Sequence, residues 1–191
     1  MVDNESPMIT DVKVIAAMTH PLRRRLLSLL RLDGPSTVGV LAQQTGQAPG
    51  NISHHLKALA AAGLVEEVPE LARDRRERWW RRSTPTIRWT TEDFKGDAET
   101  EAIARAAVSL NLDYQLNQLR QWDNLSDEEK NDWKSGPFST DHWMRLNNDE
   151  LSAFRDELIA LVSRWEDREV PDDGSVRPPV FFFAHAVPGQ P

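Results

Sequence analysis

Two short helical patterns that meet at a glycine and run into a strand constrain the fold of this chain most. They occupy residues 36–68. The first pattern repeats apolar residues at the i, i+3, i+4 spacing that gathers them on one face of a helix; these are Val38, Leu41 and Ala42. Ser36 is the predicted N-cap of this helix. Gly46 is expected to end it, because a sharp turn there favours a residue that tolerates positive φ.

The second pattern predicts a helix over about residues 49–62. Pro49 suits the first helical position and Gly63 the stop. The predicted buried face carries Ile52, Leu56, Leu59 and Ala60. The opposite face carries Asn51, Ser53, His54 and Lys57. Because these are short polar or cationic side chains without a carboxylate, they suit contact with DNA base edges and phosphates. The layout is that of a helix-turn-helix.

An arginine-dense hairpin is predicted next, over about residues 64–82. Its strands are expected at Leu64–Val68 and Arg78–Arg82, with a turn over residues 69–77. The hairpin contains Arg73, Arg75, Arg76, Arg78, Arg81 and Arg82. Such a density of guanidinium groups suits a wing along a phosphate backbone, the alternative being a solvated loop. Trp79 and Trp80 are expected mainly to pack in the core.

Residues 11–90 resemble the winged helix-turn-helix domain of the ArsR-type bacterial transcription regulators. ISHHLKALAAAGLV, from Ile52 to Val65, is similar to the family's S-x-H-L-x-x-L-x-x-A-G-L-V pattern. HPLRRRLLSLL, from His20 to Leu30, is similar to its H-P-x-R-x-x-I-L-x-x-L opening helix. The resemblance implies a DNA-binding repressor in which the helix after the wing joins the first helix in a dimer interface. A small helical bundle with no DNA role is the alternative.

Four basic or aromatic side chains near these motifs carry separate expectations. His55 fits the family pattern but is expected to point toward the scaffold rather than to DNA. Arg23, Arg24 and Arg25 cannot share one helical face. One or two of them are expected to reach phosphate, and the rest to be solvated or paired with acids of the C-terminal half.

The charge distribution divides the chain at Thr91. Residues 1–91 hold 13 Lys or Arg against 9 Asp or Glu, a balance of +4, and residues 92–191 hold 10 against 21, a balance of −11. We therefore predict a DNA-binding domain over 1–91 and a helical dimerisation or effector domain over 92–191. Because salt screens exposed charges beyond about 10 Å, an acidic second half does not cancel the basic footprint of the first.

The fold class predicted is mainly α with a small β wing, and the second half is expected to end in a short strand. Further helices are predicted at Asp11–Met18, Leu22–Arg31, Asp97–Trp122, 126–134 and Asn148–Arg168, and further strands at Thr86–Thr91, His142–Leu146 and Pro179–Val187. The block from about 97 to 187 resembles the C-terminal part of a group of actinobacterial helix-turn-helix regulators. That resemblance implies only that residues from about 97 to 187 form one associated unit, and it implies nothing about function.

Aromatic residues of the second half are numerous enough to line an effector pocket for a small molecule. The candidates are Trp122, Trp133, Trp143, Trp165 and Phe154. The alternative, an ordinary core with a dimer interface, is favoured because a unit of this size needs one. Zero cysteines exclude disulfides and thiolate metal sites, and His142 and His185 have no metal-ligand spacing, so no metal or cofactor is expected.

These patterns predict a DNA-binding transcriptional regulator, a repressor by family resemblance. As a homodimer it would bind double-stranded DNA at an imperfect palindrome. The alternative is a protein-interaction module that keeps the winged-helix fold without specific DNA binding. An enzyme is not expected, because no nucleophile motif, Walker sequence or cysteine is present. With no apolar membrane span and no signal segment, a cytoplasmic protein without membrane contact is expected.

Overall fold

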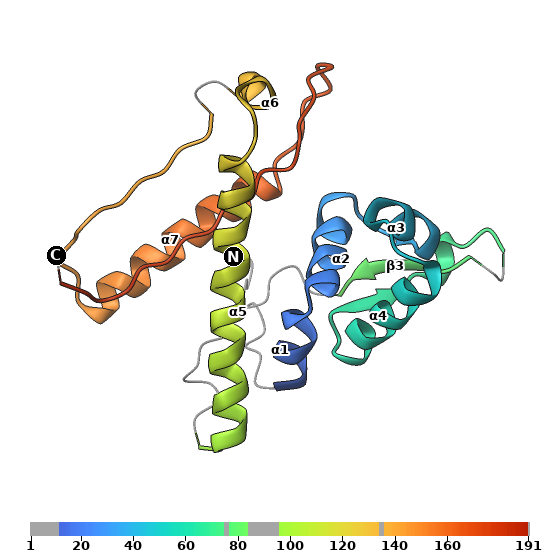
Figure 1. The fold of residues 1–191 in the computed structure, drawn as a ribbon, viewed down its shortest axis with the longest axis horizontal. Coiled ribbons are helices and arrows are strands. Elements are labelled where there is room, and N and C mark those ends of the chain that lie inside the picture. The colour runs from blue at the N-terminus through green and yellow to red at the C-terminus, as the bar shows by residue number, and fades with distance from the viewer. Residues whose placement is uncertain (1–11, 75–76, 84–95, 134–135, 191) are drawn as a thin grey trace. The chain divides into compact units, whose positions relative to one another are not determined.

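The computed structural model describes residues 12–74, 77–83, 96–133 and 136–190 (Figure 1). The chain divides into two compact units, Met1–Arg120 and Gln121–Pro191. The predicted division at residue 91 falls within 84–95, outside the described residues. Whether residues 1–91 form an independent domain therefore stays a prediction.

Four helices build most of the N-terminal unit: α1 (Val12–Thr19), α2 (Pro21–Leu32), α3 (Val38–Thr45) and α4 (Pro49–Ala61). His20 separates α1 from α2 and caps α2, because its Nδ1 accepts the backbone N–H of Leu22 at 3.2 Å. Gly46 ends α3 with φ +70° and Gly63 follows α4 with φ +70°. Both glycines thus supply the left-handed conformation that the turns require.

A three-stranded antiparallel sheet completes this unit, in the order β1–β3–β2. The strands are β1 (Ser36–Thr37), β2 (Val65–Glu67) and β3 (Trp79–Arg82), with a 3-10 turn, η1 (Pro69–Leu71), after β2. The prediction of Ser36 as N-cap is wrong. Ser36 pairs with Trp80 in the sheet, and Thr37 caps α3 by accepting the N–H of Val40 at 3.2 Å.

The core of the unit is apolar and lies between the helices and the sheet. Its fully buried side chains come from the predicted apolar faces, and they include Leu26, Leu41, Ile52, Leu56, Leu59 and Val65. Trp80 of β3 is buried with them, whereas Trp79 is half-buried. Burying each such side chain contributes roughly 1.5–3 kcal/mol, which holds α4 at a defined angle on the scaffold.

Helix α5 (Ala98–Asp123) follows the hairpin and packs on the N-terminal unit. Its small residues Ala104 and Ala107 form a second buried cluster with Ile15 of α1. Small side chains allow two helices to approach closely, so this contact lets α5 lie directly against α1. The predicted helix over Asp97–Trp122 is confirmed to within one residue at each end.

The C-terminal unit contains α6 (Asp127–Lys130), η3 (Asn131–Trp133) and α7 (Asn148–Glu166). Capping boxes start both α-helices: Ser126 exchanges hydrogen bonds with Glu129, and Asn147 with Glu150. The strands predicted at His142–Leu146 and Pro179–Val187 are wrong. Both segments are irregular, because no strand among the described residues pairs with them to satisfy their backbone groups. The strand predicted at Thr86–Thr91 lies outside the described residues.

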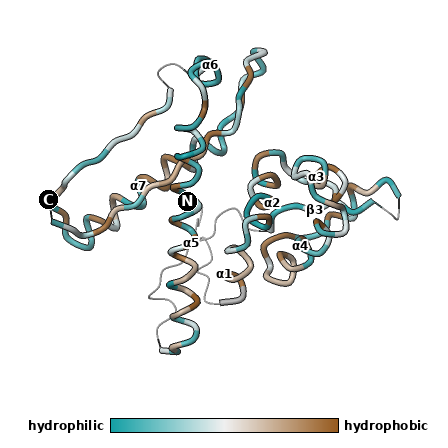
Figure 2. The backbone as a smooth tube through the Cα atoms, in the orientation of Figure 1, coloured by the Kyte–Doolittle hydropathy of each residue, from teal (hydrophilic) through white to brown (hydrophobic). Residues whose placement is uncertain are grey.

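No described residue of the C-terminal unit is buried. Hydrophobic and hydrophilic segments alternate along α7 (Figure 2). The expected ordinary core is therefore absent from the described part of this unit in the single chain. The fold class, mainly helical with a small three-stranded wing sheet, is confirmed. Among the described helices, none combines the length and apolarity needed to cross a membrane.

Candidate nucleic-acid interface

The exposed face of α4 presents three of the four predicted DNA-contacting side chains. Asn51, His54 and Lys57 are exposed at a spacing of three residues, and Ser53 is half-buried beside them. On the other side of the helix Ile52, Leu56 and Leu59 are fully buried. No acidic residue occurs in α4, so no carboxylate on this helix opposes a phosphate. The structure brings the predicted residues together on one surface.

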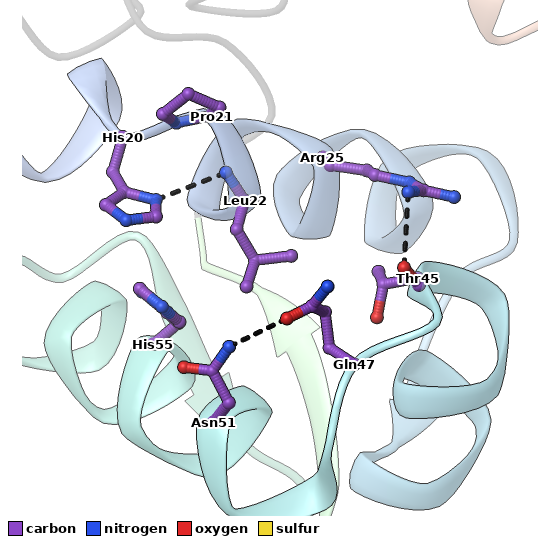
Figure 3. Close-up of a pocket in the computed structure, with 8 residues that line it drawn as sticks. All are labelled: His20, Pro21, Leu22, Arg25, Thr45, Gln47, Asn51 and His55. Carbon is purple, nitrogen blue, oxygen red and sulfur yellow. Dashed lines mark hydrogen bonds between the residues drawn. The ribbon is translucent and has the colours of Figure 1, made fainter.

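Asn51 is held in place by its neighbour in the preceding turn. Its Nδ2 donates to Oε1 of Gln47 at 3.0 Å (Figure 3). A side-chain amide has two N–H donors and one carbonyl oxygen. One N–H is used by Gln47, which leaves the second N–H and Oδ1, the donor and acceptor pair that an adenine edge requires.

His55 lies on the scaffold side of α4, as predicted. It is buried, and its Nδ1 accepts Nε–H of Arg23 at 3.4 Å. Its ring lies 4.4 Å from that of His20 and 5.4 Å from that of His54, measured between centroids. Burial is the largest cause that lowers the pKa of His55, followed by the charges of His20, Arg23 and His54. His55 is thus neutral and structural.

Two arginines of α2, Arg24 and Arg25, contact backbone, amide and aromatic groups of neighbouring helices. Arg24 donates to the backbone oxygen of Met18 at 2.8 Å and to Oδ1 of Asn111 at 2.6 Å, and lies over the ring of Tyr114. Burial lowers the pKa of Arg24, with Tyr114 acting in the opposite direction. Arg25 donates to the backbone oxygens of Gln44 and Thr45. For these two arginines, carbonyl, amide and aromatic groups of α1, α3 and α5 take the place of the acids considered as partners, and contact with phosphate stays a prediction.

Two arginines of the wing are paired within the hairpin. Arg78 lies 3.3 Å from Glu67, and Arg81 donates through Nε to Glu66 at 2.7 Å. The hydrogen bond to Glu66 is the main cause that raises the pKa of Arg81. Arg73 is exposed, and Arg75 and Arg76 lie outside the described residues. Sequence reasoning overlooked these glutamates, although antiparallel pairing of the two predicted strands places Glu66 opposite Arg81.

An open cavity of about 510 Å³ lies beside the exposed face of α4. Six of its lining residues have polar or charged side chains: His20, Arg25, Thr45, Gln47, Asn51 and His55. Pro21 and Leu22 complete the wall (Figure 3). The sequence prediction missed Gln47 and His20, whereas Arg25 is one of the three arginines considered there for contact with phosphate. The His-Pro pair that caps α2 and the glutamine one residue after the glycine turn are the signals that could have identified these two residues.

The residues predicted to line an effector pocket are exposed or half-buried in the C-terminal unit. Trp122 and Trp133 are half-buried, and Trp143, Phe154 and Trp165 are exposed, Trp165 by 62%. Three of these aromatic residues have different neighbours. Lys130 lies over the ring of Trp122, Arg168 lies over the ring of Trp165, and the ring of Trp143 lies beside Gly189. The effector pocket stays a prediction. Among the described residues no group of three metal-ligating side chains occurs.

Comparisons with known proteins support the helix-turn-helix assignment. Residues 18–68 match the family described as a helix-turn-helix domain. Among curated proteins, none matches this chain. Solved structures that resemble it include HlyU from Vibrio cholerae, with 22% identity over 58% of this chain and 97% of that one and a TM-score of 0.34. A transcriptional regulator from Thermotoga maritima has 15% sequence identity to this chain. The match covers 84% of this chain and 90% of that one, with a TM-score of 0.32.

A ZitR variant from Lactococcus lactis in apo form has 17% identity over 75% of this chain and 86% of that one, with a TM-score of 0.33. The match over residues 18–68 covers α2, both helices of the motif and β2. Its residues include the exposed face of α4 and the whole lining of the cavity.

Proposed function

We propose that this protein is a DNA-binding transcriptional regulator that inserts α4 into the major groove. The observation that carries the proposal is the exposed face of α4, where Asn51, His54 and Lys57 lie together without an acidic residue. Asn51 would contact a base edge, with weaker contacts from Ser53 and His54. Lys57, about one turn further along the helix, would contact phosphate.

The wing would add affinity that does not depend on sequence. Arg73, Arg75, Arg76 and Arg78 are the candidate phosphate contacts. For Arg78 this contact would compete with its ion pair to Glu67. Exposed ion pairs contribute only about 0–1 kcal/mol, so a polyanion can displace such a glutamate.

We further propose that the protein acts as a homodimer on an imperfect palindrome, in the manner of a repressor. Helix α5 supports this proposal, since Val108, Leu112 and Leu119 are exposed apolar residues on one side of that helix. A two-fold dimer would place two α4 helices about one turn of DNA apart. The aromatic residues of the C-terminal unit are the candidates for a small-molecule effector site.

Fluorescence anisotropy with DNA from the protein's own promoter region tests the function. We expect a complex whose affinity falls steeply with salt, and we expect Asn51→Ala combined with Lys57→Ala to weaken it. Gln121→Ala with Gln118→Ala on α5 serves as a double control. A protein-interaction module would instead give no salt-sensitive specific complex, and that result would refute the proposal.

A further inference from the structure

The cavity beside α4 is built from groups that favour an anion. None of its eight lining residues is acidic, and Arg25 contributes a cation. Residues from the first turns of two helices line it: Leu22 of α2 and Asn51 of α4. Neither helix has an acidic residue in its first turn. Because a helix N-terminus carries partial positive charge, both helix ends act in the same direction as Arg25.

Hydrogen bonds to neighbouring residues orient the polar side chains of the cavity wall and leave N–H groups that can donate to an anion. Arg25 donates through Nη2 to Gln44 at 2.7 Å and through Nη1 to Thr45 at 3.4 Å, which fixes the guanidinium at the wall and leaves three of its five N–H groups. Gln47 accepts from Asn51 through Oε1, so the NH₂ of Gln47 remains to donate. His20 accepts from Leu22 through Nδ1, which leaves Nε2 as the ring nitrogen that can donate.

From this arrangement we propose that the cavity is a seat for a phosphate oxyanion, and specifically for a backbone phosphate of the DNA that α4 contacts. The proposal rests on the proposed function and assigns it two further residues, His20 and Gln47. It also selects Arg25 from the three arginines of residues 23–25 for the phosphate contact. Their position beside Asn51 places a phosphate contact next to the base-contacting face. Phosphate contacts of this kind set the register of a recognition helix on the duplex.

Gln47→Glu is the sharpest test, because it replaces one exposed amide by a carboxylate of the same shape. We expect it to weaken binding about tenfold, equally on operator and non-operator DNA, since a phosphate contact carries no sequence information. Gln121→Glu on α5 makes the same charge change outside the cavity and should alter affinity less than twofold. Equal affinity of Gln47→Glu and the parent protein would overturn the DNA contact.

Arg25→Gln provides a second measurement. Loss of one phosphate contact should reduce the slope of log affinity against log salt by about one unit. Because Arg25 also contacts the α3–α4 turn, circular dichroism must show that the variant is folded, and Arg25→Lys should restore much of the slope. An unchanged slope in folded Arg25→Gln would contradict the contact.

Inorganic phosphate distinguishes a free anion from the DNA backbone. It would be titrated against chloride at constant ionic strength while the side-chain amide NMR signals of Gln47 and Asn51 are followed. Saturable signal shifts in the parent protein that are absent from Gln47→Glu support an oxyanion seat. If Gln47→Glu also binds DNA as tightly as the parent protein, the oxyanion that the cavity binds is a free anion and not a DNA phosphate. Shifts absent from the parent protein, together with unaltered DNA affinity in both variants, refute the seat. Absence of any salt-sensitive DNA complex would refute the proposed function alone, and the phosphate titration would still test the cavity.

Discussion

His55 connects the recognition helix to the scaffold as a neutral acceptor. Its Nδ1 receives Arg23 Nε–H, and the neighbouring His20 uses its own Nδ1 to cap α2. Protonation of His55 would place a hydrogen on its acceptor nitrogen and break the bond to Arg23. It would also gather positive charge, since the two rings are 4.4 Å apart and Arg23 lies beside them. The packing of α4 therefore requires His55 in its uncharged form.

Acidification should destabilise the protein through His55. Because the pKa of His55 is lowered in the folded state, the unfolded chain binds the proton first, near its ordinary value of about 6.5. Stability is then complete above that pH and falls as the pH drops toward the folded pKa. Urea unfolding between pH 7.5 and 5 should show this loss, and His55→Gln should reduce it. The exposed His54→Gln is the control, and an equal pH dependence in His55→Gln and the parent would contradict the role.

Asn51 should determine preference at one base pair. Replacing its bidentate amide by Ala should cost about 1–3 kcal/mol of discrimination at that position and leave other positions unchanged. Binding to a library of singly substituted operators measures the effect. Lys57→Ala is the comparison, because loss of a phosphate contact should weaken every library member equally. Uniform loss in Asn51→Ala would assign this residue to the backbone instead.

At the scale of the element, the turn between α3 and α4 depends on Gly46. Its φ of +70° is in the left-handed region, where a Cβ costs about 1–2 kcal/mol. Gly46→Ala should lower the free energy of unfolding by that amount, as measured by urea titration. Gly50→Ala is the matched control: Gly50 lies in α4 with open space around a Cβ, and the change should be neutral or stabilising by up to about 1 kcal/mol. Equal effects at the two glycines would show that backbone strain is not the cause.

Two glutamates of the wing form ion pairs with two of its arginines, and these pairs should limit the affinity of the wing for DNA. Replacing Glu66 and Glu67 by Gln frees Arg81 and Arg78 from their ion pairs. We expect binding to become several-fold tighter, with a salt slope steeper by up to about two units. Anisotropy titrations at several salt concentrations measure both quantities.

Glu157→Gln with Glu169→Gln makes the same change of charge in the C-terminal unit and should leave the slope unaltered. An equal gain from this control would indicate a general effect of net charge. Arg78→Ala with Arg81→Ala should weaken binding to all sequences. Together the variants measure whether the guanidinium groups of Arg78 and Arg81 bind the glutamates of the hairpin, the DNA phosphates or both.

At the scale of the whole molecule, apolar surface remains exposed on both units. On α5, Val108, Leu112 and Leu119 lie on one side of the helix, beside the face that packs on α1. Leu112→Glu with Leu119→Glu should convert a dimer to a monomer, measured by light scattering after size exclusion. Leu110→Glu, on the other side of α5, should retain the dimer. A monomeric parent protein would refute the homodimer proposal.

Sequence patterns predicted the helices and turns accurately where the conformation of a short segment depends mainly on its own residues. The helices of the N-terminal unit begin and end within about one residue of their predicted limits, because Pro49, Gly46 and Gly63 act on adjacent backbone. The prediction was wrong at Ser36, where pairing with β3 outweighed a good N-cap signal. It was also wrong for the two C-terminal strands, since β-propensity without a partner strand does not make a sheet.

The sequence by itself determined the helix-turn-helix, its apolar face and the polar set Asn51, His54 and Lys57, since helical periodicity places these side chains without any distant contact. Only the tertiary structure decided what those residues meet. It brought His20, the N-cap of α2, and Arg25 of α2 beside Gln47 and Asn51 to form the cavity, and it placed Glu66 and Glu67 against Arg81 and Arg78. Such contacts depend on how separate elements pack, and helical periodicity within one segment contains no information about that.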